Sequence, residues 1–271
     1  MRRWQHDVSE EWLRERQAVL TATDVAGLLP EYKRYLKAAD PDKLMPGFAA
    51  IWASKHSVAD LDTSSPSPAA ARGHIMEPWA VDSWNLQMPN KYYHWDDCII
   101  VDDSNAVSIG FSPDAMNVEQ TVPDAKLTVS QDGKFLMSHG KPVCDAPTSI
   151  MEIKSYEAPK HMKSVIKGRM DHDELMQLAM AFCVLPSLEE ARLLWFCPGS
   201  AFSMHTEKYT RDDLCDQIKW AMEIADVYHK QSQLCAKLPQ PTLTAGFTEQ
   251  EIWDAYVAEQ ALENDSVFML K

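Results

Sequence analysis

Residues 149–155 read Ser-Ile-Met-Glu-Ile-Lys-Ser, a short apolar run that is typical of a buried β-strand and that carries two charged side chains near its end. Because successive side chains of a strand point to opposite faces, Glu152 and Lys154 project together and Ile153 turns into the core. Asp114, the last residue of a Ser-Pro-Asp sequence after an earlier strand pair, can reach the same point. Two carboxylates and the Ile153 carbonyl form a hard oxygen site suited to Mg²⁺ or Mn²⁺. The adjacent lysine can orient or deprotonate a water and stabilise charge on a phosphate oxygen.

The same residues have a plainer interpretation, in which Asp114 lies in a turn and Glu152 and Lys154 form a solvated ion pair. The two carboxylates are also 38 positions apart, farther than a short hairpin would place them. Residues 119–147 are expected to form an inserted β-hairpin, turning at an Asp-Gly pair, that leaves the carboxylates adjacent in space. If this insertion instead changes the strand order, the carboxylates to consider in their place are Asp102, Asp103 and Asp145.

The periodicity along the chain predicts a mixed α/β fold with a central mixed β-sheet flanked by helices. Strands are expected at 92–101, 106–111, 126–142 (a hairpin), 149–155, 191–197 and 202–209. Helices are expected at 9–20, from 23 onward, within 31–57, at 70–87, 159–168, 171–185 and 211–234, with a proline-bearing linker at 240–244 and an acidic helix at 248–263. We expect a single domain over residues 1–271, with residues 240–271 as a C-terminal acidic helical extension.

Composition excludes several classes of protein. No run approaches the length of a transmembrane helix, and the N-terminus lacks the apolar region of a secretory signal. The six cysteines have no CxxC or CxxH spacing, which argues against a zinc site, an iron–sulfur cluster and a disulfide framework. No phosphate-binding glycine loop indicates ATP or a dinucleotide. These features predict a cytoplasmic protein with no membrane partner.

The net charge of −14 gives the chain no long-range attraction to DNA. A DNA-binding function therefore needs a local basic patch, and residues 152–169 supply one. Five basic side chains oppose Glu152 and Glu157 there: Lys154, Lys160, Lys163, Lys167 and Arg169. The patch could hold backbone phosphates beside the candidate site, or it could be a solvated helix face.

Further motifs occur in a fixed order around Asp114 and Glu152. Trp12, Arg16 and a Thr-Ala-Thr-Asp-Val sequence at 21–25 come first, followed by Arg72-Gly73 and Glu77 in R-G-x-x-x-E spacing, and Gln177 follows in the helix after residues 149–155. This ordered set, from about residue 12 to about residue 209, resembles the PD-(D/E)xK nucleases with their restriction-endonuclease-like core, specifically the branch of phage lambda exonuclease and the YqaJ-type viral recombinases.

The resemblance implies a catalytic role for five residues. Asp114 and Glu152 would be metal ligands together with the Ile153 carbonyl, and Lys154 would activate the water. Glu77 would support a metal or its water, and Gln177 would position the nucleophile or the scissile strand. Taken alone, Glu77 is equally a solvated helix residue, and Gln177 a buried amide that satisfies backbone groups.

The resemblance also implies residues that hold the DNA. Arg16 and Thr23 match the pair that grips the 5′-phosphate of a DNA end, and Arg72, Lys160 and Lys163 are expected to contact DNA. Thr23 has an independent basis, because a hydroxyl and the N–H groups at a helix N-terminus form an anion site. Its alternative is that it only caps its helix, and Arg16 could pair with a neighbouring glutamate.

The activity implied by the resemblance is a Mg²⁺-dependent exonuclease, with Mn²⁺ as a substitute, that degrades linear double-stranded DNA from 5′ ends in the 5′→3′ direction. It would leave 3′ single-stranded overhangs for phage-type recombination with a single-strand annealing protein, and it would act as a homotrimer. An endonuclease or junction-resolving nuclease, a non-catalytic DNA-end-binding protein, and an α/β protein with a purely structural Glu-x-Lys pair are the alternatives.

Overall fold

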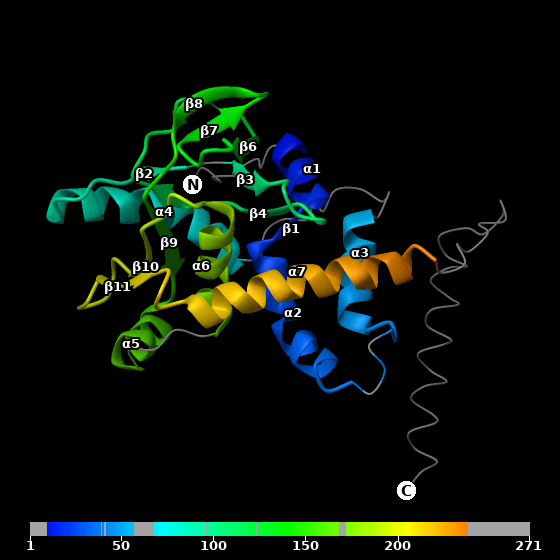
Figure 1. Cartoon of the computed structure of the whole chain (residues 1–271). Coiled ribbons are helices and arrows are strands. Elements are labelled where there is room, and N and C mark those ends of the chain that lie inside the picture. The colour runs from blue at the N-terminus through cyan, green and yellow to red at the C-terminus, as the bar shows by residue number, and fades with distance from the viewer. Residues whose placement is uncertain are drawn as a thin grey trace, which may run out of the picture. The chain divides into compact units, whose positions relative to one another are not determined.

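The computed structural model describes residues 10–38, 40, 42–56, 68–95, 97–122, 124–167 and 172–237 (Figure 1). The predicted linker at 240–244 and the acidic helix at 248–263 lie outside the described residues. The helices are α1 (Glu10–Ala18), α2 (Ala22–Tyr35), α3 (Pro46–His56), α4 (Pro68–Gln87), α5 (Ala158–Lys167), α6 (His172–Val184) and α7 (Cys215–Cys235). No helix in these ranges is both long and apolar enough to cross a membrane.

The strands form two mixed sheets, and the predicted mixed α/β fold is confirmed. One sheet has the order β1 (Leu20–Thr21), β4 (Ile109–Phe111), β3 (Ile99–Asp102), β6 (Lys126–Val129), β7 (Phe135–Ser138), β8 (Lys141–Asp145). The other has the order β11 (Met204–Thr210), β10 (Glu190–Phe196), β9 (Ser149–Ser155), β5 (Ala115–Met116), β2 (Tyr93–His94).

The strand β9 has helices on both sides, which explains how its side chains divide. Met151 and Ile153 are buried in a cluster with Trp84 and other apolar residues of α4. Ile150 points the other way, into the larger core that α2, α6 and α7 share. Because side chains alternate along a strand, Glu152 and Lys154 lie on the side of Ile150, toward α6.

The chain crosses from one sheet to the other at the Ser-Pro-Asp sequence. Strand β4 belongs to the first sheet and β5 to the second, and only residues 112–114 separate them. Strand β5 pairs antiparallel with β9, with Ala115 opposite Met151. The crossing therefore places Asp114 against the strand that carries Glu152, although the two are distant in sequence.

The residues expected as an inserted hairpin form a three-stranded extension of the first sheet. Strands β6 and β7 turn at an Asp-Gly pair where Gly133 has φ +72°, and β8 continues antiparallel to β7. The extension lies beside β3 and leaves the pairing of β5 with β9 intact. Asp102 binds the Ser104 N–H and Asn105, and Asp103 pairs with Lys126, so these two carboxylates have partners of their own.

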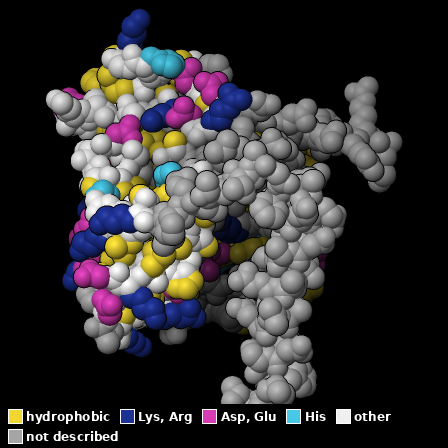
Figure 2. Space-filling view, turned by 90° about the vertical axis from the view of Figure 1, so that its right-hand side faces the viewer, with side chains coloured by type: hydrophobic (Ala, Val, Ile, Leu, Met, Phe, Trp, Pro, Cys, Tyr) yellow, Lys and Arg dark blue, Asp and Glu magenta, His cyan; other side chains and the backbone are white. Residues whose placement is uncertain are grey.

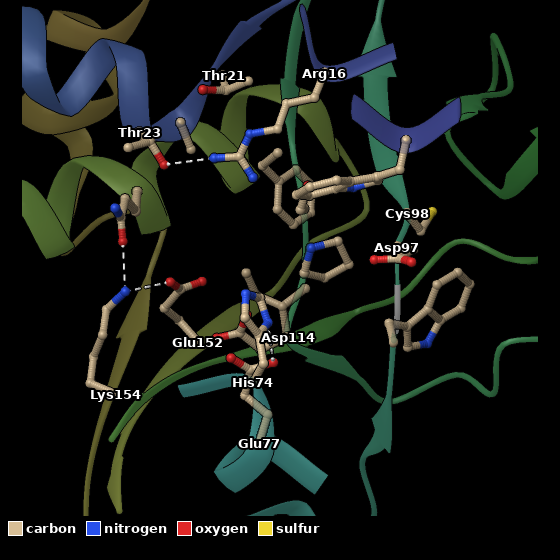
Figure 3. A pocket seen from close by; sticks show the side chains of 18 residues that line it. Arg16, Thr21, Thr23, His74, Glu77, Asp97, Cys98, Asp114, Glu152 and Lys154 are labelled. Atoms are coloured by element: carbon tan, nitrogen blue, oxygen red, sulfur yellow. Dashed lines mark hydrogen bonds and ion pairs between the residues drawn. The ribbon is translucent and has the colours of Figure 1, made fainter. Parts of the chain in front are cut away.

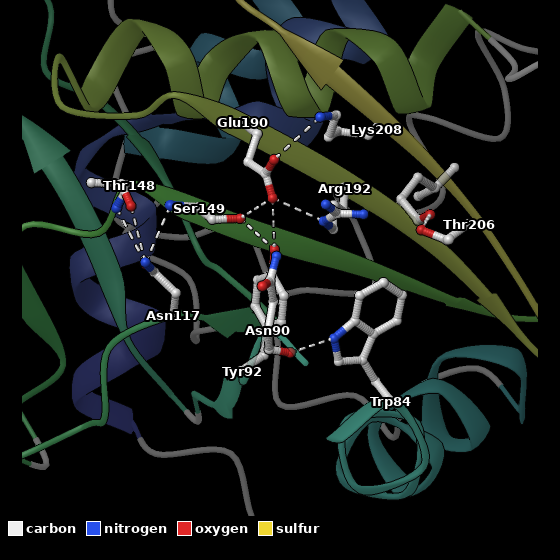
Figure 4. Close-up of polar contacts among 11 residues, drawn as sticks. Trp84, Asn90, Tyr92, Asn117, Thr148, Ser149, Glu190, Arg192, Thr206 and Lys208 are labelled. Carbon is white, nitrogen blue, oxygen red and sulfur yellow. Dashed lines mark hydrogen bonds and ion pairs between the residues drawn. The ribbon is translucent and has the colours of Figure 1, made fainter. Parts of the chain in front are cut away.

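A polar cluster fixes the beginnings of β9 and β10 (Figure 4). The carboxylate of Glu190 accepts hydrogen bonds from Arg192 Nε at 2.9 Å and from Ser149 Oγ at 3.1 Å, and Lys208 Nζ lies 3.7 Å away. The Tyr92 hydroxyl bonds to Ser149 and approaches the same carboxylate. This cluster lies at the opposite end of β9 from Lys154, so it is structural and separate from the candidate site.

Candidate active site

A cavity of about 380 Å³ is lined by residues from α1, α2, α4, α6, β9 and the crossing segment between the sheets (Figure 3). All five residues predicted to be catalytic line it: Glu77, Asp114, Glu152, Lys154 and Gln177. Ile153, the predicted carbonyl ligand, lies between Glu152 and Lys154 on β9. Arg16 and Thr23 line the same cavity. Residues that span most of the described sequence are thus brought to one place.

Asp114 is fixed by β9 itself. Its Oδ2 accepts a hydrogen bond from the Ile153 N–H at 2.6 Å, which locks the carboxylate onto the strand next to Glu152. Burial raises the pKa of Asp114 well above its usual value, and the charges of Glu152 and Glu77 raise it further. A carboxylate held in such surroundings gains from a nearby cation, because the cation offsets both the burial and the repulsion.

Lys154 connects two elements through its ammonium group. Its Nζ donates to Glu152 Oε1 at 2.6 Å and to Gln177 Oε1 at 2.9 Å, so it links β9 to α6. Burial alone would lower the pKa of Lys154, but the carboxylates of Glu152 and Asp114 outweigh it and hold this pKa above its usual value. In this arrangement Lys154 is a charged donor, and Gln177 fixes its direction.

Glu77 lies between two histidines that sequence analysis did not select. His74 Nδ1 is 3.7 Å and His94 Nε2 is 3.6 Å from Glu77 Oε2, distances typical of ion pairs and too long for good hydrogen bonds. Burial alone would raise the pKa of Glu77, but the histidines lower it to about 2. His74 is detectable in the sequence as the i−3 neighbour of Glu77 on α4, whereas His94 reaches the site through β2 and carries no local signal.

The helix α2 begins earlier than expected, and this changes the role of Thr23. Thr21 is the N-cap, since its Oγ1 accepts the Asp24 N–H at 3.3 Å while Asp24 Oδ2 accepts the Thr21 N–H at 2.9 Å. The prediction that α2 starts at Thr23 is wrong by one residue, and the interpretation of Thr23 as the cap is wrong too. A reciprocal capping box at Thr21 and Asp24 fits the sequence better, because both partners satisfy backbone N–H groups.

Thr23 is instead an exposed residue of the first turn and contacts the other predicted phosphate ligand. Arg16 Nη2 donates to Thr23 Oγ1 at 3.5 Å, and the Arg16 guanidinium lies 4.9 Å from the centre of the Trp12 ring. Burial lowers the pKa of Arg16, and the charges of Asp24 and Glu152 oppose that effect. The hydroxyl, the guanidinium and the start of α2 together form a surface that suits an anion.

The remaining predicted DNA contacts lie outside this cavity. Arg72 Nη1 pairs with Glu157 Oε1 at 3.3 Å, and its Nη2 donates to the Ser155 carbonyl at 3.4 Å. Lys160 is exposed, with its Nζ 3.7 Å from the centre of the Tyr156 ring, and Lys163 is exposed on α5. The face drawn in Figure 2 shows basic, acidic and hydrophobic side chains interspersed on its described part.

The donor atoms of the cavity fit a hard divalent cation. Asp114, in the segment that leads into β5, and Glu152 of β9 offer carboxylate oxygens, and burial together with the charges of Glu152 and Glu77 raises the pKa of Asp114. Among the described residues, no three or more His, Cys, Asp and Glu side chains converge as a ready metal cluster. A ligand set of two carboxylates and one backbone carbonyl does not require three such side chains, and Mg²⁺ commonly keeps several waters.

Comparison with known proteins identifies the fold. No protein-family model matches the sequence, and comparison with curated protein sequences gives no match. The structure of LHK-Exo in complex with dAMP is similar with a TM-score of 0.54 and 15% identity, over 85% of this chain and 100% of that one. A second structure, the alkaline exonuclease LHK-Exo from Laribacter hongkongensis, gives a TM-score of 0.51 at 15% identity over the same shares.

A phage-related exonuclease from Haemophilus somnus aligns over 82% of this chain and 96% of that one at 10% identity, with a TM-score of 0.47 that is too low to establish a shared fold. The two LHK-Exo structures establish that this chain has the fold of that exonuclease. The fold predicted from the ordered motifs is therefore confirmed. At these identities the similarity concerns the fold alone.

Proposed function

We propose that this protein is a metal-dependent nuclease that degrades linear double-stranded DNA from its 5′ ends. The observation that carries the proposal is the convergence of Asp114, Glu152, Lys154 and Gln177 in one cavity with the Arg16–Thr23 pair. The first four residues supply what phosphodiester hydrolysis needs, and the last two supply an anion site at the other end of the same cavity. The similarity in fold to an alkaline exonuclease supports this choice of chemistry.

Asp114, Glu152 and the Ile153 carbonyl would hold Mg²⁺ or Mn²⁺. When bound, the ion would lower the pKa of a water and neutralise charge on the phosphate under attack. The side chains around the ion position it and the reacting groups. Asp114 is kept in place by the Ile153 N–H, and Gln177 aims the Lys154 ammonium into the cavity, where it can orient the attacking water and stabilise a phosphate oxygen.

Glu77 has a supporting role in this scheme. The pairs with His74 and His94 keep its carboxylate ionised and directed into the cavity from α4. It can thereby accept hydrogen bonds from waters that surround the ion. Although Glu77 is far from β9 in the sequence, α4 packs on the second sheet and so brings Glu77 to the same cavity.

The direction of digestion follows from the proposed place of the DNA end. With the terminal 5′-phosphate at Arg16 and Thr23, the first linkage of that strand extends toward Asp114 and Glu152, so the strand is shortened from its 5′ end and 3′ overhangs remain. We further propose, on the resemblance of the ordered motifs, a homotrimer, a cytoplasmic location in a phage or prophage host, and a single-strand annealing protein as partner in recombination.

The test uses purified protein with Mg²⁺ and two substrates, a 5′-phosphorylated linear duplex and a covalently closed circle. We expect release of nucleotides from the linear duplex alone, no release in EDTA, and at least a 100-fold loss for Lys154→Ala, as expected when a group that acts in the transition state is removed. Lys208→Ala is the matched control, because Lys208 is an exposed lysine of the structural cluster around Glu190. It should leave the rate unchanged.

Other outcomes would indicate other functions. Cleavage of the closed circle would replace the exonuclease with an endonuclease or junction-resolving enzyme. Binding of duplex ends without turnover in Mg²⁺ or Mn²⁺ would indicate a non-catalytic end-binding protein. Absence of both binding and turnover would leave the Glu152–Lys154 pair as a structural feature and would contradict the proposal.

A further inference from the structure

A second hollow, of about 290 Å³, lies against the candidate active site at the end of β9. It is lined by Arg72 of α4, by residues 153–157 at the end of β9, and by Lys160 of α5. Lys154 lines both this hollow and the catalytic cavity, so the two are neighbours on either side of one lysine. Apart from Ile153 and Lys154, no residue with a catalytic role described above lines the hollow.

The charge of the hollow is opposite to that of the chain. Arg72 and Lys160 bring two cationic groups to it, and Lys154 lines it as well, although its ammonium group binds Glu152 and Gln177. Glu157 is its one acidic lining residue, whereas the whole chain carries −14. Arg72 Nε is buried and has no hydrogen-bond partner among the described residues. A buried donor without a partner is costly, which indicates that a ligand with acceptor atoms completes this site.

The contact between Arg72 and the Glu157 carboxylate indicates that the hollow suits an anionic group. Its carboxylate lies 3.3 Å from Arg72 Nη1, yet its side chain is 76% exposed and can swing into solvent. Glu157 contacts the guanidinium through one oxygen, whereas a phosphate can offer it two in a bidentate pair. Lys160 is held nearby by the face of the Tyr156 ring, and the Tyr156 hydroxyl is fixed by Glu174 at 2.5 Å.

The position of the hollow along a bound strand follows from the site. In the cavity Arg16 and Thr23 lie on one side, Asp114 and Glu152 lie across from them, and the Lys154 ammonium lies beside Glu152, with the lysine backbone farther from Arg16 (Figure 3). A strand whose 5′-phosphate is at Arg16 and Thr23 and whose first linkage is at the carboxylates continues past Lys154. The hollow lined by Arg72 adjoins the cavity at Lys154, so it is the neighbouring place where the next phosphate of such a strand could be held.

We propose that the hollow between Arg72, Lys154 and Lys160 binds the first backbone phosphate on the 3′ side of the linkage being cleaved. This phosphate belongs to the strand that remains after a nucleotide leaves. The inference rests on the proposed function, and it assigns to Arg72 and Lys160 the task of holding the retained strand while the released nucleotide departs.

The experiment measures binding of a fluorescent 5′-phosphorylated duplex by anisotropy, with Ca²⁺ in place of Mg²⁺ and gels to verify that no cleavage occurs. Three duplexes are compared. The first is unmodified, and the second has a neutral methylphosphonate at the linkage that follows, on the 3′ side, the terminal linkage to be cleaved. The third has the same group six linkages farther on. We expect the first modification to weaken binding by the wild-type protein about tenfold, as for loss of one charge-assisted contact. The distant modification should have little effect.

The variant Arg72→Gln should bind the unmodified duplex about tenfold more weakly and should be insensitive to the first methylphosphonate, because the two changes remove the same contact. For Arg72→Gln, the slope of log Kd against log salt concentration should be smaller than that of the wild type by about one. Arg192→Gln is the matched control, since it also removes an Arg–Glu pair, here a partly buried one near the beginnings of β9 and β10. It should respond to both modified duplexes as the wild type does.

Glu157→Gln gives a test that misfolding cannot imitate. Removing the carboxylate that competes for Arg72 should tighten binding of the unmodified duplex severalfold. Lys160→Gln, a substitution of an exposed residue, should weaken it. If the losses from Arg72→Gln and from the first methylphosphonate simply multiply, or if Glu157→Gln binds no more tightly, the hollow is not a phosphate site. If the wild type neither binds nor degrades linear duplexes, the proposed function itself fails, which is a separate result.

Discussion

The variant Thr23→Ala separates recognition of a DNA end from the stability of α2. Thr21 caps this helix, and Thr23 is an exposed residue of its first turn. The substitution therefore removes a hydroxyl that can face a phosphate without removing the capping box. Because alanine has a higher helix propensity than threonine, the free energy of unfolding should stay the same or rise by a few tenths of a kcal/mol.

The expected loss in recognition is much larger. The Arg16–Thr23 contact is 3.5 Å long, so the hydroxyl is weakly engaged and is available to a phosphate oxygen. A hydrogen bond to a charged group contributes about 1.5–3 kcal/mol. The preference for a 5′-phosphate over a 5′-hydroxyl end should therefore fall about 10- to 100-fold, since about 1.4 kcal/mol corresponds to a factor of ten.

The assay compares kcat/KM on duplexes that differ only in the 5′ group, for the wild type and for Thr23→Ala, with thermal unfolding of both proteins. Thr21→Ala is the companion variant, and losing its cap should cost about 1 kcal/mol of stability. If Thr23→Ala keeps the full preference for the 5′-phosphate, the terminal phosphate does not lie at Arg16 and Thr23. The proposed direction of digestion would then lose its structural basis.

Three further predictions concern stability. The pKa of Glu77 is lowered from 4.5 to about 2, so its ionised form stabilises the fold above pH 4.5, and this stabilisation is lost as the pH falls toward 2. In Glu77→Gln the free energy of unfolding, measured across this pH range, should lack this acid-dependent contribution, which is on the order of 3 kcal/mol. Asp114→Asn should make the metal-free protein more stable at neutral pH, because burial and the charge of Glu152 destabilise the ionised Asp114. It should also abolish the thermal stabilisation by Mg²⁺, which for the wild type is about 2.7 kcal/mol at a Mg²⁺ concentration of 100 times Kd. Continued stabilisation of the variant by Mg²⁺ would contradict the role of Asp114 as a ligand. Gly133→Ala, at φ +72°, should cost about 1 kcal/mol in denaturant unfolding and leave nuclease activity unchanged, and a neutral effect on stability would show that the turn relaxes.

Features governed by local periodicity were predictable from the sequence. Strand β9 has the bounds expected from its apolar run, and Ile153 turns into the core as alternation requires. The helix that carries Gln177 also lies where expected, within one residue of its predicted limits. In these segments the apolar pattern determines both the type of element and the face it buries.

Features that depend on tertiary pairing were not predictable in the same way. The division of the strands between two sheets depends on a crossing at residues 112–114 that no local pattern marks. His94 reaches Glu77 through the pairing of β2 with β5, and Asp97 lines the cavity of the candidate active site from a left-handed conformation with φ +42°. The cap at Thr21, by contrast, has a local signal, because Asp24 follows it at the spacing of a capping box and no acidic residue follows Thr23 at that spacing.

The acidic composition of the chain is compatible with a role on DNA because charge is arranged locally. Near the carboxylates of Asp114 and Glu152, the cationic groups of Arg16 and Lys154 line the same cavity, and Arg72 and Lys160 line the hollow that adjoins it. A strand placed along these groups meets positive charge on both sides of the linkage to be cleaved. Because the rest of the chain is strongly acidic, DNA held elsewhere on the surface gains little, so the net charge favours binding of a threaded end over indiscriminate binding.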